Sequence, residues 1–292
     1  MRRSEGISLA GLIAIIVVVL VVVAGVAALG YRFYLRARER SNRATCMAHL
    51  SSLGKAIALY KNQWDNKWPW IENVRSDMTA VATGTNRQKD PYDDPKDPGE
   101  RSITSLMFLL LHDGQPRELF ICPSDSDAVL EPAIRYYSED DEEEVYCWDF
   151  SSHRNVSYSW QAPVWRSEKW RSGIIDDDPD VVIVADKTPL YDDPGWQPDD
   201  VSTASDSSVL QRNMSQNHGG QVIHALRVAM NVTRTERPDV GGRRQDNIYT
   251  ASNDRRRGSR RATSLKAAEH LSPLDSFLVG PVRGTGARTG GK

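Results

Sequence analysis

The chain has 292 residues, a net charge of −2 at pH 7 and 39% hydrophobic residues. This length allows one large domain or two small ones, and the nearly balanced charge excludes a bulk attraction to nucleic acid or to strongly acidic partners. The charge is uneven, because residues 139–144 read EDDEEE and residues 255–261 read RRRGSRR. Such blocks are typical of solvated loops.

Residues 6–29 form an uncharged run, GISLAGLIAIIVVVLVVVAGVAAL, with fifteen Ile, Leu or Val. A helix that crosses a bilayer core of about 30 Å needs roughly 20 apolar residues. At about −0.4 kcal/mol for each of these side chains, insertion is favoured by about 6 kcal/mol. The run predicts a transmembrane helix over residues 7–31, with membrane lipid as a partner. A cleaved signal peptide is the alternative, because residues 24–28 are small.

The helical pattern continues beyond this run. Residues 32–62 contain no proline, and their one glycine is Gly54. Apolar residues recur at spacings of three and four, which predicts an amphipathic helix; they are Met47, Leu50, Leu53, Ile57, Tyr60 and Trp64. We therefore expect one continuous helix from about residue 7 to residue 62. The segment assigned to its amphipathic continuation is 32–64.

Residues 65–281 are expected to form one α+β domain, followed by a disordered tail over 282–292. An apolar stretch at 102–111 predicts a short helix, and residues 118–122 and 156–160 predict strands. Residues 181–185, VVIVA, are apolar throughout, so this strand is expected at the centre of a small antiparallel sheet. The predicted architecture is a long N-terminal helix packed on that sheet, with long irregular loops.

A short basic head at residues 1–5 is followed by Gly6, Ser8, Leu9 and Leu12. At these positions the N-terminus resembles that of type IV prepilins and type II secretion pseudopilins. The resemblance implies that residues 1–6 are a leader, and that a prepilin peptidase cuts between Gly6 and Ile7 and methylates the new N-terminus. The glutamate that pairs with the next subunit's amine in this family is replaced by Gly11. Because an unpaired amine in a membrane is expensive, this replacement argues against polymerisation into a filament.

Later blocks resemble the planctomycete-type pilin-like group. They lie at residues 46–60, 215–223, 246–250 and 275–281. In the group a strand after the NHGG-Q block reaches an Asp-Gly turn, where the present sequence has Met230. A turn of that kind needs a positive φ, which Met does not adopt easily. The sequence therefore predicts that this hairpin is reshaped.

The resemblance implies a non-catalytic structural subunit of a secretion or pilus-like assembly, with other pilin-like subunits as partners. It also implies a single-pass protein of the inner (cytoplasmic) membrane whose C-terminal domain is extracytoplasmic. The arginine count favours the opposite orientation, because Arg2 and Arg3 precede the run whereas five arginines lie at positions 32–43. The alternative function is a membrane-tethered extracytoplasmic binding protein or enzyme with an unprocessed anchor.

The sequence contains none of the common catalytic or nucleotide-binding motifs, so we expect no enzyme activity, cofactor or metal. His218 and His224 lie six residues apart, and Asp186 follows a predicted strand. These three side chains form a conceivable metal site, although a tight turn at residues 217–220 is the favoured interpretation. Asp125 and Asp127 are interpreted as a solvated turn rather than a calcium site.

The three cysteines allow one disulfide and one leftover thiol. A bridge between Cys122 and Cys147 would close a loop of about 26 residues and stabilise the fold by roughly 3 kcal/mol. Disulfides persist in the oxidising compartment expected for an extracytoplasmic domain. This pairing is favoured because the two cysteines flank the acidic loop, and a bridge would hold that loop against the repulsion of its six like charges. A Cys46–Cys122 bridge and three free thiols are the alternatives.

Overall fold

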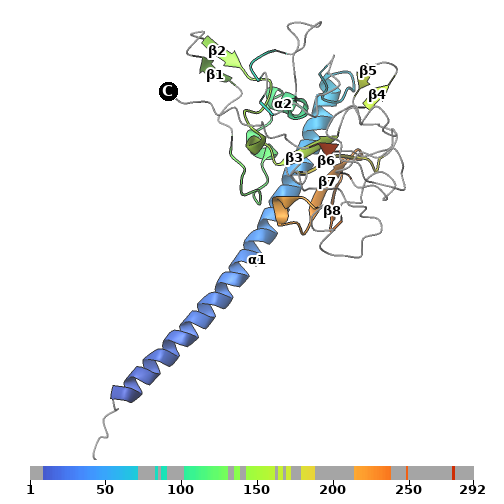
Figure 1. The fold of residues 1–292 in the computed structure, drawn as a ribbon. Coiled ribbons are helices and arrows are strands. Elements are labelled where there is room, and N and C mark those ends of the chain that lie inside the picture. The colour runs from blue at the N-terminus through green and yellow to red at the C-terminus, as the bar shows by residue number, and fades with distance from the viewer. Residues whose placement is uncertain are drawn as a thin grey trace, which may run out of the picture. The chain divides into compact units, whose positions relative to one another are not determined.

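The fold is known from a computed structural model, which describes residues 9–71, 83–84, 87–90, 102–130, 135–138, 143–161, 164–166, 169–171, 179–187, 214–237, 248 and 278–279. The chain divides into two units, Met1–Arg43 and Ala44–Lys292, which are considered separately below. Figure 1 labels the helices and strands. The expected leader, the predicted cleavage bond, the RRRGSRR block and the C-terminal tail lie outside the described residues.

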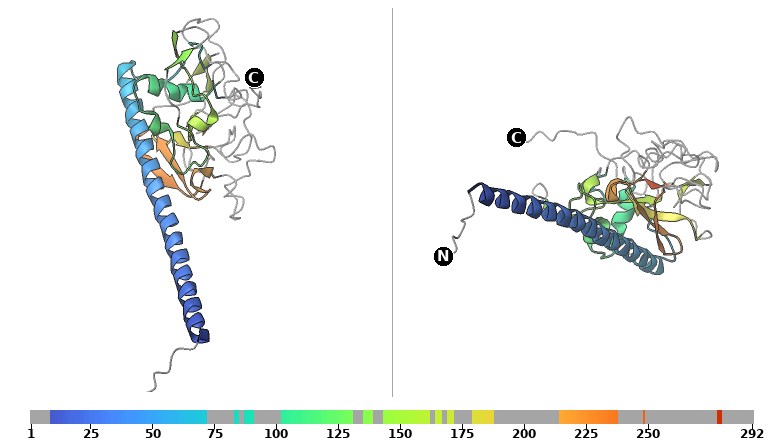
Figure 2. Two further views of the ribbon diagram at one scale, coloured as in Figure 1. Left: turned by 90° about the vertical axis from the view of Figure 1, so that its left-hand side faces the viewer. Right: turned by 90° about the horizontal axis from the view of Figure 1, so that it is seen from below.

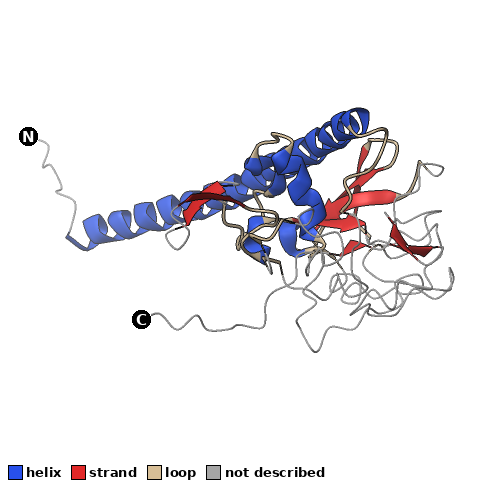
Figure 3. Ribbon diagram, turned by 90° about the horizontal axis from the view of Figure 1, so that it is seen from above, coloured by secondary structure: helices blue, strands red, loops and turns tan. Residues whose placement is uncertain are grey.

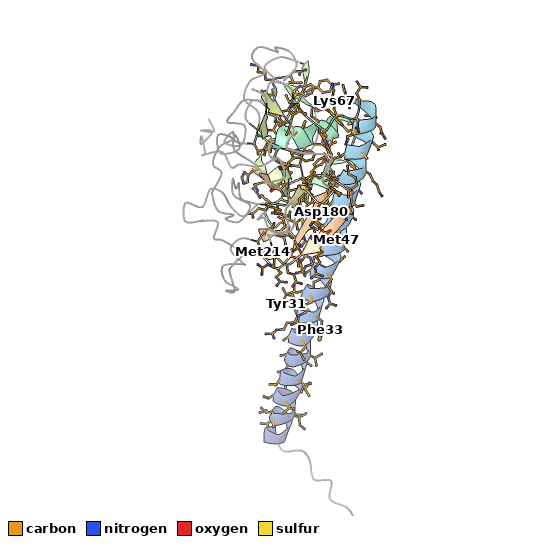
Figure 4. All side chains as sticks on the ribbon, turned by 90° about the vertical axis from the view of Figure 1, so that its right-hand side faces the viewer. Tyr31, Phe33, Met47, Lys67, Asp180 and Met214 are labelled. Carbon is orange, nitrogen blue, oxygen red and sulfur yellow. The ribbon has the colours of Figure 1, made fainter. Side chains whose placement is uncertain are left out.

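Helix α1, Leu9–Gln63, is the main element of the first unit and runs on into the second. It is 55 residues long, as the uninterrupted helical pattern predicted. In the first unit its apolar side chains stand out from the helix, including those of Tyr31 and Phe33 (Figure 4). The helix ends where Asp65 and Asn66 adopt positive φ values of 50° and 61°, a left-handed conformation that Asn and Asp tolerate better than most residues.

The second unit is built on a five-stranded antiparallel sheet in the order β8-β7-β6-β3-β9. Its strands are β3 (Tyr158–Gln161), β6 (Val182–Asp186), β7 (Ile223–Arg227), β8 (Val232–Thr235) and β9 (Leu278–Val279). Strand β6 is central and fully buried, as its continuous apolar sequence predicted. Two separate two-stranded ladders are formed by β1 (Arg135–Ser138) with β2 (Glu143–Tyr146) and by β4 (Val164–Arg166) with β5 (Lys169–Arg171).

Short helices complete the second unit (Figure 3). They are α2 (Thr104–His112) and the 3-10 turns η2 (Arg117–Phe120), η3 (His153–Asn155) and η4 (Gln216–His218). Turn η2 replaces the strand predicted over 118–122, so that prediction is wrong. The turn begins after Pro116, and the Ile121 backbone N–H donates to the Glu118 carbonyl oxygen at 3.2 Å. This compact conformation directs Phe120 into the core, where it is fully buried.

The main core lies between the last part of α1 and the sheet (Figure 2). The buried stripe of α1 in this unit consists of Cys46, Leu50, Leu53, Ile57 and Tyr60. The predicted stripe also included Met47 and Trp64, but in the structure Met47 is half-buried and Trp64 is 56% exposed. The observed architecture is therefore a long helix with a small antiparallel sheet, an α+β fold.

The β7–β8 hairpin differs from its prediction at Met230. This residue adopts a φ of 59°, and its backbone N–H donates to the Arg227 carbonyl oxygen at 2.8 Å. The Arg227 N–H in turn donates to the Asn231 carbonyl oxygen at 3.0 Å and closes the hairpin. The methionine thus takes the positive φ that the sequence argued against. Its side chain packs on the main core, which helps to hold the strained backbone.

Candidate functional site

Four side chains able to bind a metal or exchange a proton meet inside the second unit. Cys46 comes from α1, Asp186 from the end of β6, His218 from η4 and His224 from β7. One ligand atom of each lies within 4.8 Å of those of the other three, and all four residues are buried. We call this group the Cys-Asp-His cluster.

The sheet and the turn before β7 bring the cluster together. Ala185 of β6 pairs with Ala225 of the antiparallel strand β7. Asp186, which follows Ala185, therefore lies beside His224, which precedes Ala225. His218 approaches from η4, and the chain then turns into β7 through Gly219 and Gly220, whose φ values are 62° and 71°. Glycine adopts these angles without the clash that a Cβ would cause.

Asp186 is the hub of the cluster. Its Oδ2 accepts the backbone N–H of His224 at 2.7 Å and lies 3.1 Å from Nδ1 of the same residue. The same oxygen lies 3.7 Å from His218 Nε2. Its Oδ1 accepts hydrogen bonds from the Cys46 thiol and from Asn217 Nδ2, both at 3.3 Å. Contacts with four residues therefore fix the orientation of the Asp186 carboxylate.

Two thiols lie at the other side of the cluster. Cys46 Sγ is 3.3 Å from the Tyr158 hydroxyl oxygen, and Cys122 Sγ is 3.5 Å from His218 Nε2. Burial raises the pKa of the Cys46 thiol, and its hydrogen bond to Cys122 and the charge of Asp186 raise it further. The same hydrogen bond from Cys46, aided by His218, lowers the pKa of Cys122 to about 7 despite burial. The hydrogen bond between the two thiols therefore shifts their pKa values in opposite directions.

The two imidazole rings pack edge to face, with centroids 4.7 Å apart. His224 is oriented by Asp186 through its Nδ1, while its Nε2 is buried and has no hydrogen-bond partner among the described residues. A buried polar atom without a partner is costly. This nitrogen is therefore the one atom of the cluster whose environment is incomplete.

The cluster does not have the geometry of a nucleophilic relay. In such a relay the thiol and the carboxylate contact different nitrogens of one imidazole. Here the same atom, His218 Nε2, faces both Cys122 and Asp186. The side chains of His218 and Asp186 are also 0% exposed, so a substrate in solvent does not reach them. The arrangement fits a structural role in the core or a closed metal site.

Asp186, His218 and His224 were predicted to lie near one another, and the structure does bring these three side chains together. The predicted group did not include Cys46 or Cys122, which lie elsewhere in the chain. The tight turn expected at 217–220 is present as η4 followed by two glycines with positive φ. The burial of Cys46 could have been predicted from its place on α1, because it precedes Leu50 by four residues and so lies on the same buried stripe.

The structure does not contain the expected Cys122–Cys147 disulfide; the three cysteines are buried and not disulfide-bonded. Cys122 is instead directed toward His218 and the Cys-Asp-His cluster. At Cys147 the backbone carbonyl oxygen lies 2.6 Å from His112 Nε2.

Asp125 lies in a turn, as predicted, but its side chain is only 9% exposed, so it is less solvated than the sequence suggested. Asp125 Oδ1 accepts the backbone N–H of Asp127 at 3.2 Å. Its Oδ2 accepts the Ser157 hydroxyl at 2.8 Å and lies 3.6 Å from Lys187 Nζ. Because the lysine already neutralises this carboxylate, the turn has a structural explanation. The predicted processing residues, Gly6 and Ile7, lie outside the described residues.

A second buried carboxylate, Asp149, has a structural role. It accepts hydrogen bonds from the hydroxyls of Ser102 and Thr104 and from the backbone N–H groups of Gly84 and Phe150, at 2.6 to 2.9 Å. Desolvation outweighs these four bonds and raises its pKa to about 6. Asp149 thus ties the start of α2 to residues from two other segments.

The apolar part of α1 is the second candidate functional region. It is long and apolar enough to span a membrane, judged by length and composition. Its Ile, Leu and Val side chains from Leu12 to Leu35 are 43% to 66% exposed. Exposed apolar side chains around a whole helix are typical of a lipid-facing segment. Within the part of the chain that the structure describes, this is the one candidate membrane span.

Searches against protein-family models, characterised proteins and solved structures find no match to this chain.

Proposed function

We propose that this chain is a non-catalytic, membrane-anchored structural subunit of the type IV pilin and pseudopilin kind. In this proposal a prepilin peptidase cuts after Gly6, and the second unit lies on the extracytoplasmic side of the inner membrane. The subunit would work in a secretion or pilus-like assembly with other pilin-like subunits. The proposal rests on the resemblance at the N-terminus and on one structural observation.

That observation is that one helix, α1, provides both the exposed apolar segment of the first unit and part of the core of the second unit. In the first unit the helix exposes apolar side chains throughout, as a membrane anchor requires. From Cys46 onward the same helix contributes a buried stripe to the core of the α+β unit. A simple tether has no need for this continuity, because a flexible linker would connect an anchor to a domain equally well. An anchor that is also a core element suits a subunit that assembles through its helix.

The test is mass spectrometry of the N-terminal peptide from protein purified out of membranes of cells that contain a prepilin peptidase. We expect the chain to begin at Ile7 with a methylated amine. The matched control is Gly6→Trp, in which a bulky residue precedes the bond, and it should keep its leader. An intact 1–6 segment in the natural protein would overturn the proposal and favour the unprocessed tether.

Orientation has its own test, because the arginines at positions 32–43 favour a cytoplasmic second unit. A protease added to intact spheroplasts should digest loops of an extracytoplasmic domain. We expect cleavage in intact spheroplasts to match that in lysed ones. Protection until lysis would place the second unit in the cytoplasm and contradict the proposal.

A further inference from the structure

We propose that the Cys-Asp-His cluster binds one Zn²⁺ ion through its four members, Cys46, Asp186, His218 and His224. The inference stands apart from cleavage after Gly6, because all four residues belong to the second unit. Its starting point is the convergence of one sulfur, one carboxylate and two imidazoles within 4.8 Å. Asp186 lies 140 positions from Cys46 and 38 from His224, so local sequence does not account for this convergence.

The spacing of the atoms fits a tetrahedral ion. With bonds of about 2.0 Å to N or O and about 2.3 Å to S, ligand atoms of a tetrahedral zinc lie about 3.3 to 3.6 Å apart. Asp186 Oδ1 lies 3.3 Å from Cys46 Sγ, and Asp186 Oδ2 lies 3.7 Å from His218 Nε2 and 3.1 Å from His224 Nδ1. These contacts are close to the tetrahedral range. The four ligand atoms together lie within 4.8 Å of one another, so they would draw closer together around a bound ion.

The types of ligand select the metal. Calcium and magnesium prefer sets made of oxygen atoms, whereas a thiolate with two imidazoles suits zinc and related transition ions. The four residues are 0% to 2% exposed, which corresponds to a closed structural site rather than a catalytic site with an open position. The Tyr158 hydroxyl, 3.3 Å from Cys46 Sγ, and the Asn217 amide, 3.3 Å from Asp186 Oδ1, would support the ligands from outside.

A bound ion would fasten α1 to the sheet, because Cys46 is the one ligand that the helix supplies. The competing structure is a Cys46–Cys122 disulfide, since these thiols are hydrogen-bonded neighbours. A disulfide would consume the cysteine ligand, and so the two states exclude each other. The experiment below separates them.

The test uses the full chain purified in detergent without chelators or added reductant. Elemental analysis should find about one zinc per chain, and mass spectrometry under denaturing, non-reducing conditions should find three free thiols. Removal of the metal with a strong chelator should lower the unfolding midpoint, and added Zn²⁺ should restore it. Replacement by Co²⁺ should give a visible spectrum with a sulfur-to-cobalt charge-transfer band.

The variants Cys46→Ser and His224→Gln should lose stoichiometric zinc and the response of the unfolding midpoint to added Zn²⁺. Cys147→Ser is the matched control, because Cys147 is equally buried but not in the cluster, and it should keep both. The proposal is overturned if the purified natural chain holds a Cys46–Cys122 disulfide. It is also overturned if the reduced, demetallated chain neither takes up Zn²⁺ nor changes its midpoint, a result that requires no variant to fold.

Discussion

A Cβ atom added to Gly54 of α1 would lie 3.0 Å from Leu226 Cδ1 of β7 and 3.7 Å from Met230 Sδ. Gly54 is buried, and Leu226 is 0% exposed. The glycine therefore lets the helix approach the sheet closely at this point. Glycine costs about 1 kcal/mol relative to alanine in a helix interior, and the close packing gives a reason to accept that cost.

Gly54→Leu should lower the free energy of unfolding by about 2 to 3 kcal/mol, because the added side chain meets a fully packed core. Gly54→Ala should stay close to the natural chain, since its helix propensity offsets a tight contact with the flexible end of Leu226. Urea unfolding of the full chain in detergent measures both. The control is Lys55→Leu on the exposed side of the same helix, where a near-neutral effect is expected. Equal effects at positions 54 and 55 would contradict the packing argument.

Asp149 should make the domain less stable as the pH rises from about 4 to about 6. Its folded pKa of about 6 lies above the ordinary value of 3.8, so the folded state binds more protons than the unfolded state within this window. The contribution of this carboxyl is therefore fully present below the unfolded pKa and is lost as the pH passes the folded pKa. The difference between these two pKa values corresponds to roughly 3 kcal/mol.

The measurement compares the natural chain with Asp149→Asn across pH 4 to 7, because the difference between the two cancels the titration of other groups. Asn resembles the protonated acid and does not titrate, so the variant should gain roughly 3 kcal/mol relative to the natural chain as the pH rises. A difference that runs the other way would mean that the four hydrogen bonds to the carboxylate outweigh its desolvation.

Local patterns predicted α1, α2 and the central strand β6 because their residues carry the signal themselves. Spacings of three and four define the helix, and VVIVA defines a strand buried on both faces. The same reasoning failed at residues 118–122, where a short apolar stretch forms a 3-10 turn. Strand propensity in so short a stretch is weak compared with the burial of Phe120.

The Cys-Asp-His cluster was only partly predictable for a different reason. Asp186, His218 and His224 were grouped because they flank strands close in sequence. Cys46 is separated from Asp186 by 140 positions, and its role depends on how α1 docks on the sheet. Cys147 was the favoured partner of Cys122 because the two residues flank the acidic loop in the sequence, whereas the structure directs the Cys122 thiol toward Cys46 and His218.

The backbone strain at Met230 leads to a third prediction. A left-handed φ costs a non-glycine residue roughly 1 to 2 kcal/mol. Met230→Gly and Met230→Ala lose the same packing, and they differ in this backbone cost. The glycine variant should therefore be the more stable of the two by about 1 kcal/mol, as measured by urea unfolding. At exposed Lys55 in α1 the order should reverse, with Lys55→Ala above Lys55→Gly by about 1 kcal/mol. The same order at both positions would contradict the strain at Met230.

The apolar part of α1 should tolerate one arginine in the membrane but not two. Its fifteen Ile, Leu and Val side chains favour insertion by about 6 kcal/mol, and one arginine near the centre costs about 3 kcal/mol. Val18→Arg should therefore remain in the membrane fraction after alkaline extraction. Addition of Val22→Arg brings the sum close to zero, so the double variant should be released. The double variant Val18→Leu and Val22→Leu controls for the loss of β-branched residues and should stay inserted. Retention of the two-arginine chain would mean that the second unit, rather than the helix, holds the protein at the membrane.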